Sequence, residues 1–386
     1  MNKGTVGTRL LERSIIKHIE KGSIHGVGPA CDYSVLDACS SGISISSIGF
    51  ADETLSLSGE QITRGELAYL RASNNMATSG GSAKNMLVTI TASPDTEEQI
   101  LRDEMNNLSA LAHRENIRIA GGNTVYTGEA SSGKVDSKEA TGNKVDFEEA
   151  TGNKVDFKEA AGNMVAEVNS DYSRKNIVKT EMSGNVGIHI TLIGEVDSEL
   201  FSRISRKPKV GDSIVIYGYA GELGANILMD ERESELTDRF AEFYLRESRM
   251  DYGNLDIRKP VSLFISAGAE FIHDVSYGGI YRSLYEMSEY AGHGIEILHE
   301  KIPVKQSTIE VCEMLGINPY RLLGMGSFVA AVPSEKLESF EQSLTEQGIS
   351  YSVAGTFTEK KERVISSKSY EMKRALTLYD KDELFK

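Results

Sequence analysis

The chain has 386 residues, with 42 lysines and arginines against 57 aspartates and glutamates, and a formal net charge of −15. This length exceeds what one typical core organises and suggests two domains. The hydrophobic share of 40% is ordinary for a globular protein. The negative charge disfavours nonspecific binding to nucleic acid or to anionic membranes. It does not exclude nucleotide binding, because backbone turns and metal ions can hold phosphates.

The N-terminal stretch lacks the apolar core of a signal peptide, since charged residues interrupt it from Arg9 to Glu20. No apolar run approaches the roughly 20 residues that a membrane helix needs. The three cysteines, Cys31, Cys39 and Cys312, include no Cys-x-x-Cys pair and make no disulfide framework. We therefore expect a cytoplasmic, reduced protein that binds neither nucleic acid nor a membrane.

The first half of the chain alternates predicted strands and helices. Partial alternation of apolar residues predicts a strand over Gly42–Ile48, followed by a helix over Gln61–Thr78. Met86–Ile90 reads as a buried strand. Thr96–Gln99 matches a capping box and predicts the start of a second helix, whose apolar residues recur at helical spacing. Ile117–Ala120 predicts a strand that ends in a turn at Gly121 and Gly122.

A ten-residue unit then repeats in Gly142–Thr151 and Gly152–Ala161. This unit is too short for the helical solenoid repeats of roughly 20–50 residues. We expect a polar surface insertion, about residues 128–183, without a catalytic role. An interaction tether or a short stack of β-hairpins is the alternative interpretation. A strand over Val186–Gly194 is predicted after the insertion.

Ser205–Lys209 has the composition of a linker, so we expect an N-terminal domain over residues 1–204 and a C-terminal domain over 205–386. Ser334, after Pro333, is a predicted helix N-cap. Strands separated by helices in both halves predict an α/β or α+β fold class. The strands predicted in the second half are Ser213–Tyr217, Gly294–Leu298, Phe328–Val332 and Tyr351–Ala354.

Four clusters of glycines and polar residues are candidates for chemistry. In the first, Gly26–Ser34, a glycine turn can bring the backbone to a nucleotide while Asp32 holds a cation. In Ile272–Gly279, an apolar run ends in an acid, a hydroxyl and two glycines, and a helical pattern follows at once. That turn offers backbone N–H groups and a carboxylate together, which suits phosphate and metal–nucleotide chemistry. Within it, His273 is either a structural histidine or a base, and Asp274 is either an N-cap or a ligand.

The other two clusters are ambiguous by themselves. Ala72–Gly81 places Asn74 and Asn75 near a helix end, where capping alone would explain them. Gly121–Thr124 is equally well explained as a tight turn. A further motif, Gly218–Gly224, has the spacing G-x-x-G-x-x-G, whereas a dinucleotide turn requires G-x-G-x-x-G, and the sequence contains no P-loop. These patterns therefore argue against a Rossmann oxidoreductase.

The order of the four clusters resembles the aminoimidazole ribonucleotide (AIR) synthetase superfamily, and most of all its HypE-like, AIR-synthase-related members. Cys31–Asp37 matches G-[DE]-D-A-A-V-[IL]-D, and Ser73–Gly80 matches A-N-D-[IVL]-A-[AV]-x-G. Gly121–Thr124 matches G-G-[HDE]-T, and Asp274–Gly279 matches D-[VP]-[ST]-x-G-G. The resemblance covers nearly the whole chain except the repeats.

This resemblance implies a two-domain PurM-like architecture, with an N-terminal ATP-binding domain and a C-terminal α/β domain. It also implies a homodimer in which the N-terminal sheets meet, with ATP and Mg²⁺ as cofactors. The shared chemistry is ATP-dependent phosphorylation, often of an amide or carbamoyl oxygen that becomes a leaving group. By resemblance, Asp274 and His273 are catalytic, Asp32 and Asn75 bind the metal, and the cofactor contacts are Asp32, Asn74, Asn75, Gly121, Gly122, Asn123, Thr124, Ser276, Gly278 and Gly279.

Several residues depart from the family pattern. Asn75, Asn123 and Ser47 stand where the family has acids, and neutral oxygen ligands should lower the affinity for Mg²⁺. The last cysteine is Cys312, whereas HypE proteins carry their substrate on a cysteine near the C-terminus. Two functions therefore remain open. One is an ATP-dependent phosphoryl-activating enzyme that acts on a small-molecule or protein-borne substrate, such as a carbamoyl-type group. The other is a non-catalytic paralogue that serves as a dimeric binding or scaffold protein.

Overall fold

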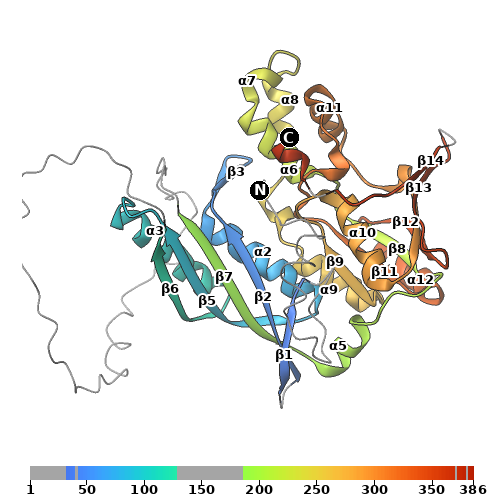
Figure 1. The fold of residues 1–386 in the computed structure, drawn as a ribbon, viewed down its shortest axis with the longest axis horizontal. Coiled ribbons are helices and arrows are strands. Elements are labelled where there is room, and N and C mark those ends of the chain that lie inside the picture. Colours follow the sequence, from blue (N-terminus) through green and yellow to red (C-terminus); the bar gives the residue numbers. More distant parts are fainter. Residues whose placement is uncertain (1–31, 40–41, 128–185, 370–371, 380) are drawn as a thin grey trace, which may run out of the picture.

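The computed structural model describes residues 32–39, 42–127, 186–369, 372–379 and 381–386, and their strands form two large sheets and a small hairpin (Figure 1). The five-stranded sheet uses strands from the first half of the chain, and the seven-stranded sheet uses strands from the second half. The domain boundary at residues 204/205 stays a prediction. The repeat insertion and the glycines of Gly26–Ser34 lie outside the described residues.

The first sheet has the order β1-β2-β7-β5-β6, in which only β5 and β6 run parallel. Along β2, alternate residues from Ile45 to Ala51 are buried against helix α2, while Ile48 and Phe50 face away from it. The approach is close, since a Cβ on Gly49 would lie 1.9 Å from the Ala68 carbonyl oxygen. The strands are β1 (Ser34–Cys39), β2 (Gly42–Ala51), β5 (Ser82–Ala92), β6 (Arg118–Tyr126) and β7 (Gly187–Val196).

Helix α2 (Arg64–Thr78) begins three residues later than predicted, because Glu60–Ile62 (β4) pairs with Leu55–Leu57 (β3) in the small hairpin. Thr63 is the N-cap: its hydroxyl accepts the Glu66 N–H, and the Glu66 side chain accepts the Thr63 N–H. This reciprocal capping box fixes the start of the helix.

The capping box predicted at Thr96–Gln99 is wrong. Helix α3 (Glu98–Arg114) has Glu97 as its N-cap, without a side-chain hydrogen bond. Thr96 therefore lies one position before the cap, and its buried hydroxyl has no hydrogen-bond partner among the described residues. Ser334 is likewise not the cap of a following α-helix, because a 3₁₀ turn (Ser334–Lys336) comes first and α12 starts at Leu337.

The turn predicted at Gly121 and Gly122 is also wrong, because both glycines lie inside strand β6. They pair with Leu87 and Val88 of β5 beside a register shift, and a Cβ on Gly122 would lie 1.8 Å from the Val88 carbonyl oxygen. The glycines thus permit a close approach of two parallel strands rather than a reversal of the chain.

The second sheet has the order β14-β13-β10-β12-β8-β11-β9 and is antiparallel except between β10 and β13. Three of its predicted strands are confirmed with their bounds, and the fourth is extended to Thr358. The strands are β8 (Ser213–Tyr217), β9 (Phe271–Asp274), β10 (Gly294–Leu298), β11 (Phe328–Val332), β12 (Ser352–Thr358), β13 (Arg363–Ser367) and β14 (Met372–Ala375).

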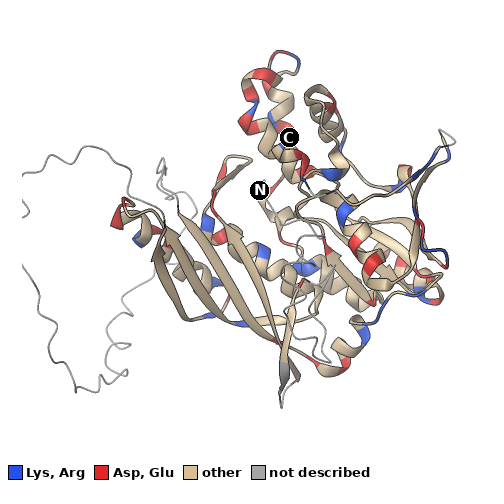
Figure 2. Ribbon diagram, viewed as in Figure 1, with Lys and Arg blue, Asp and Glu red and all other residues tan. Residues whose placement is uncertain are grey.

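Helices cover both faces of the second sheet. Phe264 of α9 and Phe340 of α12 pack with Phe328 in one cluster, while Leu284 and Met287 of α10 pack with Ile295 in another. Acidic side chains are numerous on α7 and α8, and basic ones on β13 and β14 (Figure 2). None of the described helices has the length and apolarity to cross a bilayer. The helices of this half are α5 (Ser198–Ile204), α6 (Glu222–Glu231), α7 (Glu233–Leu236), α8 (Glu242–Glu247), α9 (Arg258–Ala267), α10 (Gly279–Ala291), α11 (Gln306–Leu315) and α12 (Leu337–Glu346).

Candidate functional site

The turn from β9 into α10 lies where the second sheet meets α2 of the first half (Figure 1). Gly278 and Gly279 have φ values of +88° and +64°, which reverse the chain directly after the strand. A Cβ on Gly279 would lie 2.7 Å from both the Tyr320 and the Leu322 carbonyl oxygens, so only glycine fits this position. Gly278 is the N-cap residue of α10, which leaves the Asp274 side chain outside the capping geometry.

Asp32 reaches this turn from the far end of the sequence. Its Oδ1 lies 2.7 Å from His273 Nδ1, and its Oδ2 accepts the backbone N–H of Asp274 at 3.1 Å. The other imidazole nitrogen, Nε2, lies 3.2 Å from Glu286 Oε2, and Arg282 donates to Glu286 Oε1 at 2.8 Å. The four side chains form one row of alternating charge, and each is at most 13% exposed.

This row of charges controls the protonation of His273. Burial acts to lower the pKa of His273, but Asp32 and then Glu286 outweigh it and raise this pKa well above its usual value. An imidazolium with a carboxylate at each nitrogen donates twice and has no lone pair to accept a proton. In this arrangement His273 orients Asp32, and a catalytic role for it stays a prediction.

Asp274 is the second acid of this turn, and its carboxyl lies beside that of Asp32. Burial raises its pKa well above the usual value, the charge of Asp32 raises it further, and His273 opposes the rise. Ligand atoms of Asp32, His273 and Asp274 all lie within 4.8 Å of one another. Because His273 Nδ1 is already paired, the oxygens of Asp32 and Asp274 are the pair that fits a hard cation such as Mg²⁺, whose charge would offset the repulsion between them.

The two asparagines of α2 behave differently from each other. Asn74 is buried, its Nδ2 donates to the Leu255 carbonyl at 2.8 Å, and its Oδ1 accepts the Ile257 N–H at 3.2 Å. Both ends of this amide thus hold α2 against the segment before α9. Asn75 is only half-buried and donates to the Ile48 carbonyl on the edge of β2. Ser47 is buried and donates to the Ala72 carbonyl.

The Gly121–Thr124 segment is not brought to Asp32. In the sheet order, β7 and β5 separate β6 from β2, and all four residues are exposed. Asn123 Oδ1 accepts the N–H of the adjacent Thr124. No described contact joins this segment to Asp32 or Asp274, so its assignment to the cofactor stays a prediction.

Asp382 was missed by sequence reasoning. Its carboxylate accepts the N–H groups of Gly278 (2.5 Å), Leu323 (3.3 Å) and Leu384 (2.8 Å). The Gly278 N–H predicted for phosphate is therefore engaged by an internal carboxylate, while Ser276 remains exposed beside it. Glu286 and Arg282 were missed too, although their i,i+4 spacing on a predicted helix is a signal for an ion pair.

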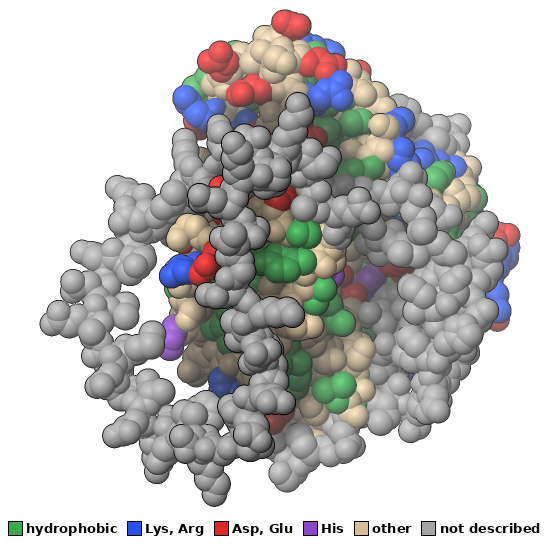
Figure 3. Space-filling model, turned by 60° about the vertical axis from the view of Figure 1, so that its left-hand side comes forward, with side chains coloured by type: hydrophobic (Ala, Val, Ile, Leu, Met, Phe, Trp, Pro, Cys, Tyr) green, Lys and Arg blue, Asp and Glu red, His purple; other side chains and the backbone are tan. Residues whose placement is uncertain are grey.

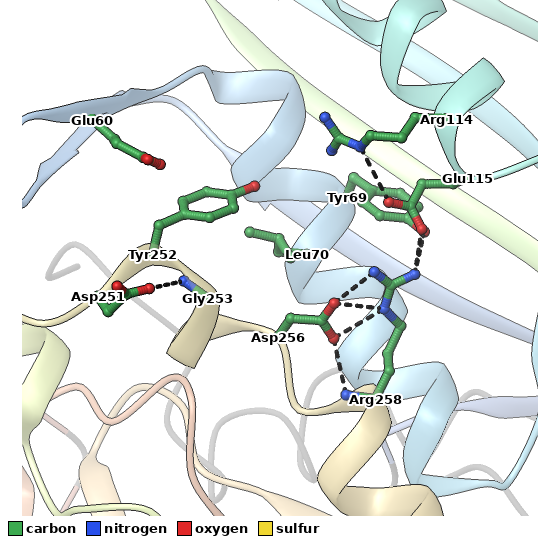
Figure 4. Close-up of a pocket in the computed structure, with 10 residues that line it drawn as sticks. All are labelled: Glu60, Tyr69, Leu70, Arg114, Glu115, Asp251, Tyr252, Gly253, Asp256 and Arg258. Carbon is green, nitrogen blue, oxygen red and sulfur yellow. Dashed lines mark hydrogen bonds and ion pairs between the residues drawn. The ribbon is translucent and has the colours of Figure 1, made fainter. Parts of the chain in front are cut away.

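A cavity of about 320 Å³ lies elsewhere between the two halves (Figure 4). Arg258 donates to Asp256 and to Glu115, and the Tyr69 hydroxyl donates to Glu115 at 3.2 Å. This network joins α2, the end of α3 and the start of α9, which identifies it as a joint between the halves. None of the predicted site residues lines the cavity, whose lining is Glu60, Tyr69, Leu70, Arg114, Glu115, Asp251, Tyr252, Gly253, Asp256 and Arg258.

Comparison with known sequences gives a family for the second half. Residues 209–367 match the family model described as AIR synthase related protein, C-terminal domain. A putative hydrogenase expression/formation protein of Methanocaldococcus jannaschii is 27% identical over 159 residues, which are 40% of this chain and 44% of that protein. Carbamoyl dehydratase HypE of Bradyrhizobium diazoefficiens is 27% identical over 34% of this chain and 36% of its own length. The chain thus spans less than half of the length of these two relatives.

Solved structures extend the likeness of the fold to the whole chain. A structure of the HypE–HypF complex matches with a TM-score of 0.64 at 18% identity, covering 96% of this chain and 99% of the other. A structure of the hydrogenase maturation protein HypE in complex with ATP matches with a TM-score of 0.59 at 15% identity, covering 99% and 94%. Both sheets and the Asp274 turn therefore belong to a two-domain PurM-like fold. Residues 209–367 thus belong to the AIR synthase related family through its C-terminal domain, and the chain as a whole has the PurM-like two-domain fold.

Proposed function

We propose that this protein binds ATP at the Asp32–Asp274 site and uses it to phosphorylate an oxygen of a small or protein-borne substrate, with a carbamoyl-type group as the preferred class. The observation that carries the proposal is the paired position of Asp32 and Asp274, two little-exposed carboxylates held together at a strand-to-helix turn. The ATP bound by a HypE protein of the same fold supports it.

Phosphoryl transfer depends mainly on positioning and on neutralising charge as it develops. Asp32 and Asp274 would hold one Mg²⁺, which supplies positive charge for the phosphates. The His273 imidazolium and the Glu286–Arg282 pair fix the Asp32 carboxylate so that it does not turn away. Cys312 is buried, and burial raises the pKa of its thiol to about 12, so this cysteine is unsuited to carry the substrate. The substrate in this proposal is a separate molecule.

Titration calorimetry of the full chain with ATP and Mg²⁺ tests the proposal. We expect binding by the native chain and a loss of at least about tenfold, or about 1.4 kcal/mol, in Asp32→Ala and Asp274→Ala. The matched control is Asp251→Ala, which removes an acid that lines the other cavity and caps the turn Tyr252–Leu255. Absence of binding at millimolar ATP contradicts the proposal. Loss of binding in the Asp251 variant alone would move the nucleotide to the other cavity.

We also infer that the protein is a homodimer through the exposed face of the first sheet. Large apolar side chains on this sheet are exposed, and apolar side chains gather on the face seen in Figure 3. An apolar patch of this kind on a sheet favours burial against a second copy. The exposed apolar residues on this face are Ile48, Phe50, Leu87 and Val125, which alternate with buried residues on β2 and β5 or pair in the same register on β6. A cytoplasmic location stays a prediction.

A non-catalytic paralogue is the alternative. Asn75 and Ser47, which replace family acids, donate to the carbonyl oxygens of Ile48 and Ala72 and bring no negative charge to the site. A fold kept with fewer metal ligands suits a binding or scaffold role. Measured ATP turnover by the native chain would reject this alternative, because a scaffold requires none.

A further inference from the structure

Arg71 of α2 lies one helical turn before Asn75, and sequence reasoning gave it no role. Its Nη1 donates to the Phe50 carbonyl at 2.5 Å, and its Nη2 donates to the Tyr277 hydroxyl at 3.2 Å. The guanidinium carbon also lies 5.5 Å from the centre of the Tyr277 ring. Since Phe50 belongs to the first sheet and Tyr277 to the Asp274 turn, Arg71 stands at the corner where the two halves meet.

The charge of Arg71 has no counter-ion within the described residues. Its two acceptors are a carbonyl and a phenol, and no described carboxylate oxygen lies within 4.0 Å of its guanidinium. Two other partly buried arginines are paired, since Arg282 pairs with Glu286 and Arg258 with Asp256. A half-exposed guanidinium without a carboxylate partner can accept an incoming anion without first breaking an ion pair. The guanidinium has five N–H groups, more than these two bonds use, and its fork suits a phosphate.

Among the described residues, β2 loses one of its neighbours beside this corner. Strand β1 pairs with β2 only as far as Ser46, so β2 continues beyond it without that neighbour. The carbonyl groups of Ile48 and Phe50 on this stretch accept from Asn75 and Arg71 instead. Arg71, Asn75 and the turn that contains Asp274 therefore border one region.

We propose that Arg71 is an anion-binding residue of the candidate site and holds a phosphate group of a polyphosphate ligand beside the Asp274 turn. Its positive charge would offset part of the phosphate charge beside Asn75, whose amide brings no charge of its own. Only the identification of the ligand as a nucleotide rests on the proposed function.

Two calorimetric titrations test the proposal, each on the native chain and on Arg71→Gln. The first uses inorganic tripolyphosphate in the presence of EDTA, and the second uses Mg-ATP without EDTA. We expect the affinity for tripolyphosphate to fall at least tenfold in Arg71→Gln and by less in Arg71→Lys, which keeps the charge and provides a second variant if the first folds poorly. The matched control is Arg203→Gln, because Arg203 is also half-buried and donates to a carbonyl, that of Ile265. It should bind as the native chain does.

Tyr277→Phe separates binding from positioning, since it removes the hydroxyl that Arg71 contacts but leaves the charge. It should bind tripolyphosphate within a few-fold of the native chain. The proposal is overturned if Tyr277→Phe loses as much affinity as Arg71→Gln does, or if Arg71→Gln keeps the native affinity. It is also overturned if the native chain does not bind tripolyphosphate. Binding of tripolyphosphate through Arg71 without any binding of Mg-ATP would sink the proposed function and leave the anion site standing. If the native chain binds Mg-ATP and Arg71→Gln changes neither affinity, the anion site is refuted and the proposed function stands.

Discussion

His273 Nδ1 lies 2.7 Å from Asp32 Oδ1, a contact between residues 241 positions apart that joins the start of the described chain to the β9–α10 turn. Asp32 also accepts the Asp274 N–H, so one carboxylate fixes both residues of the strand end. The site is thus built before any ligand arrives, and its charges make its stability depend on pH.

Replacing His273 should destabilise the fold most at low pH. The pKa of His273 is raised in the folded state, so its contribution is full below the unfolded value of about 6.5 and is lost as the pH rises through the folded value. His273→Gln breaks a buried charge pair and should cost about 3–5 kcal/mol near pH 6. Urea unfolding at pH 6 and pH 9 measures the difference. A cost that does not shrink at pH 9 would show that His273 is neutral in the folded protein.

Asp274→Asn should stabilise the protein near neutral pH. The folded-state pKa of Asp274 is raised, so ionising it opposes folding at every pH above its unfolded value of about 4. Removing this charge should add about 1–2 kcal/mol at pH 7.5, as often found for charges kept for function, and little at pH 4. Thermal unfolding at both values checks this, with the exposed Asp238→Asn as the control. Destabilisation at pH 7.5 would contradict it.

Asn74→Ala should weaken the contact between α2 and the segment before α9. It removes two buried hydrogen bonds and leaves the Leu255 carbonyl and the Ile257 N–H without partners. The expected loss is about 2–4 kcal/mol in the free energy of unfolding, from the bonds and the unsatisfied groups together. Urea titration measures it. Asn123→Ala, whose side chain is exposed and bonds only the adjacent N–H, should change stability by at most about 0.5 kcal/mol.

Asn75→Asp should strengthen Mg²⁺-dependent ATP binding. The change adds a charged oxygen to the α2 face that borders the Asp274 turn, and hard cations favour charged oxygens, so we expect an affinity gain on the order of tenfold. Calorimetry with and without EDTA measures the gain. Asn106→Asp adds the same charge on the exposed face of α3 and should have no effect. An equal gain in both variants would mean that the charge acts nonspecifically.

Ile48→Glu should split the homodimer. Ile48 is 63% exposed on β2, where a charge in a sheet-to-sheet contact would be buried without a partner. Light scattering after gel filtration should give a dimeric mass for the native chain and a monomeric mass for the variant. Val210→Glu, at a residue 48% exposed outside this sheet, is the control and should stay dimeric. A native monomer at micromolar concentration would refute the inferred interface.

Local patterns were sufficient to predict most elements of the second half. Strands β8, β10 and β11 are short apolar runs bounded by turn residues, and α10 has a continuous apolar stripe, so neighbours in sequence define them. The helix starts at Thr96 and Ser334 were misplaced because a capping motif specifies a cap only where the backbone first becomes helical. Gly121 and Gly122 were misread because a glycine pair permits a turn and a close strand contact equally well.

The residues of the candidate site also divide into those predicted from sequence and those found only in the structure. The sequence by itself determined the β9–α10 turn with its glycines, the acids Asp32 and Asp274, and the superfamily to which their order points. Only the tertiary structure decided that Asp32 and Glu286 together keep His273 charged and that Asp382 engages the Gly278 N–H. It also decided that Asn74 holds the halves together and that Arg71 lies beside Tyr277. The reason is physical, because hydrogen bonds and ion pairs need their atoms within about 3–4 Å of each other. For groups far apart in sequence, the packing of the two sheets sets that distance, not the spacing along the chain.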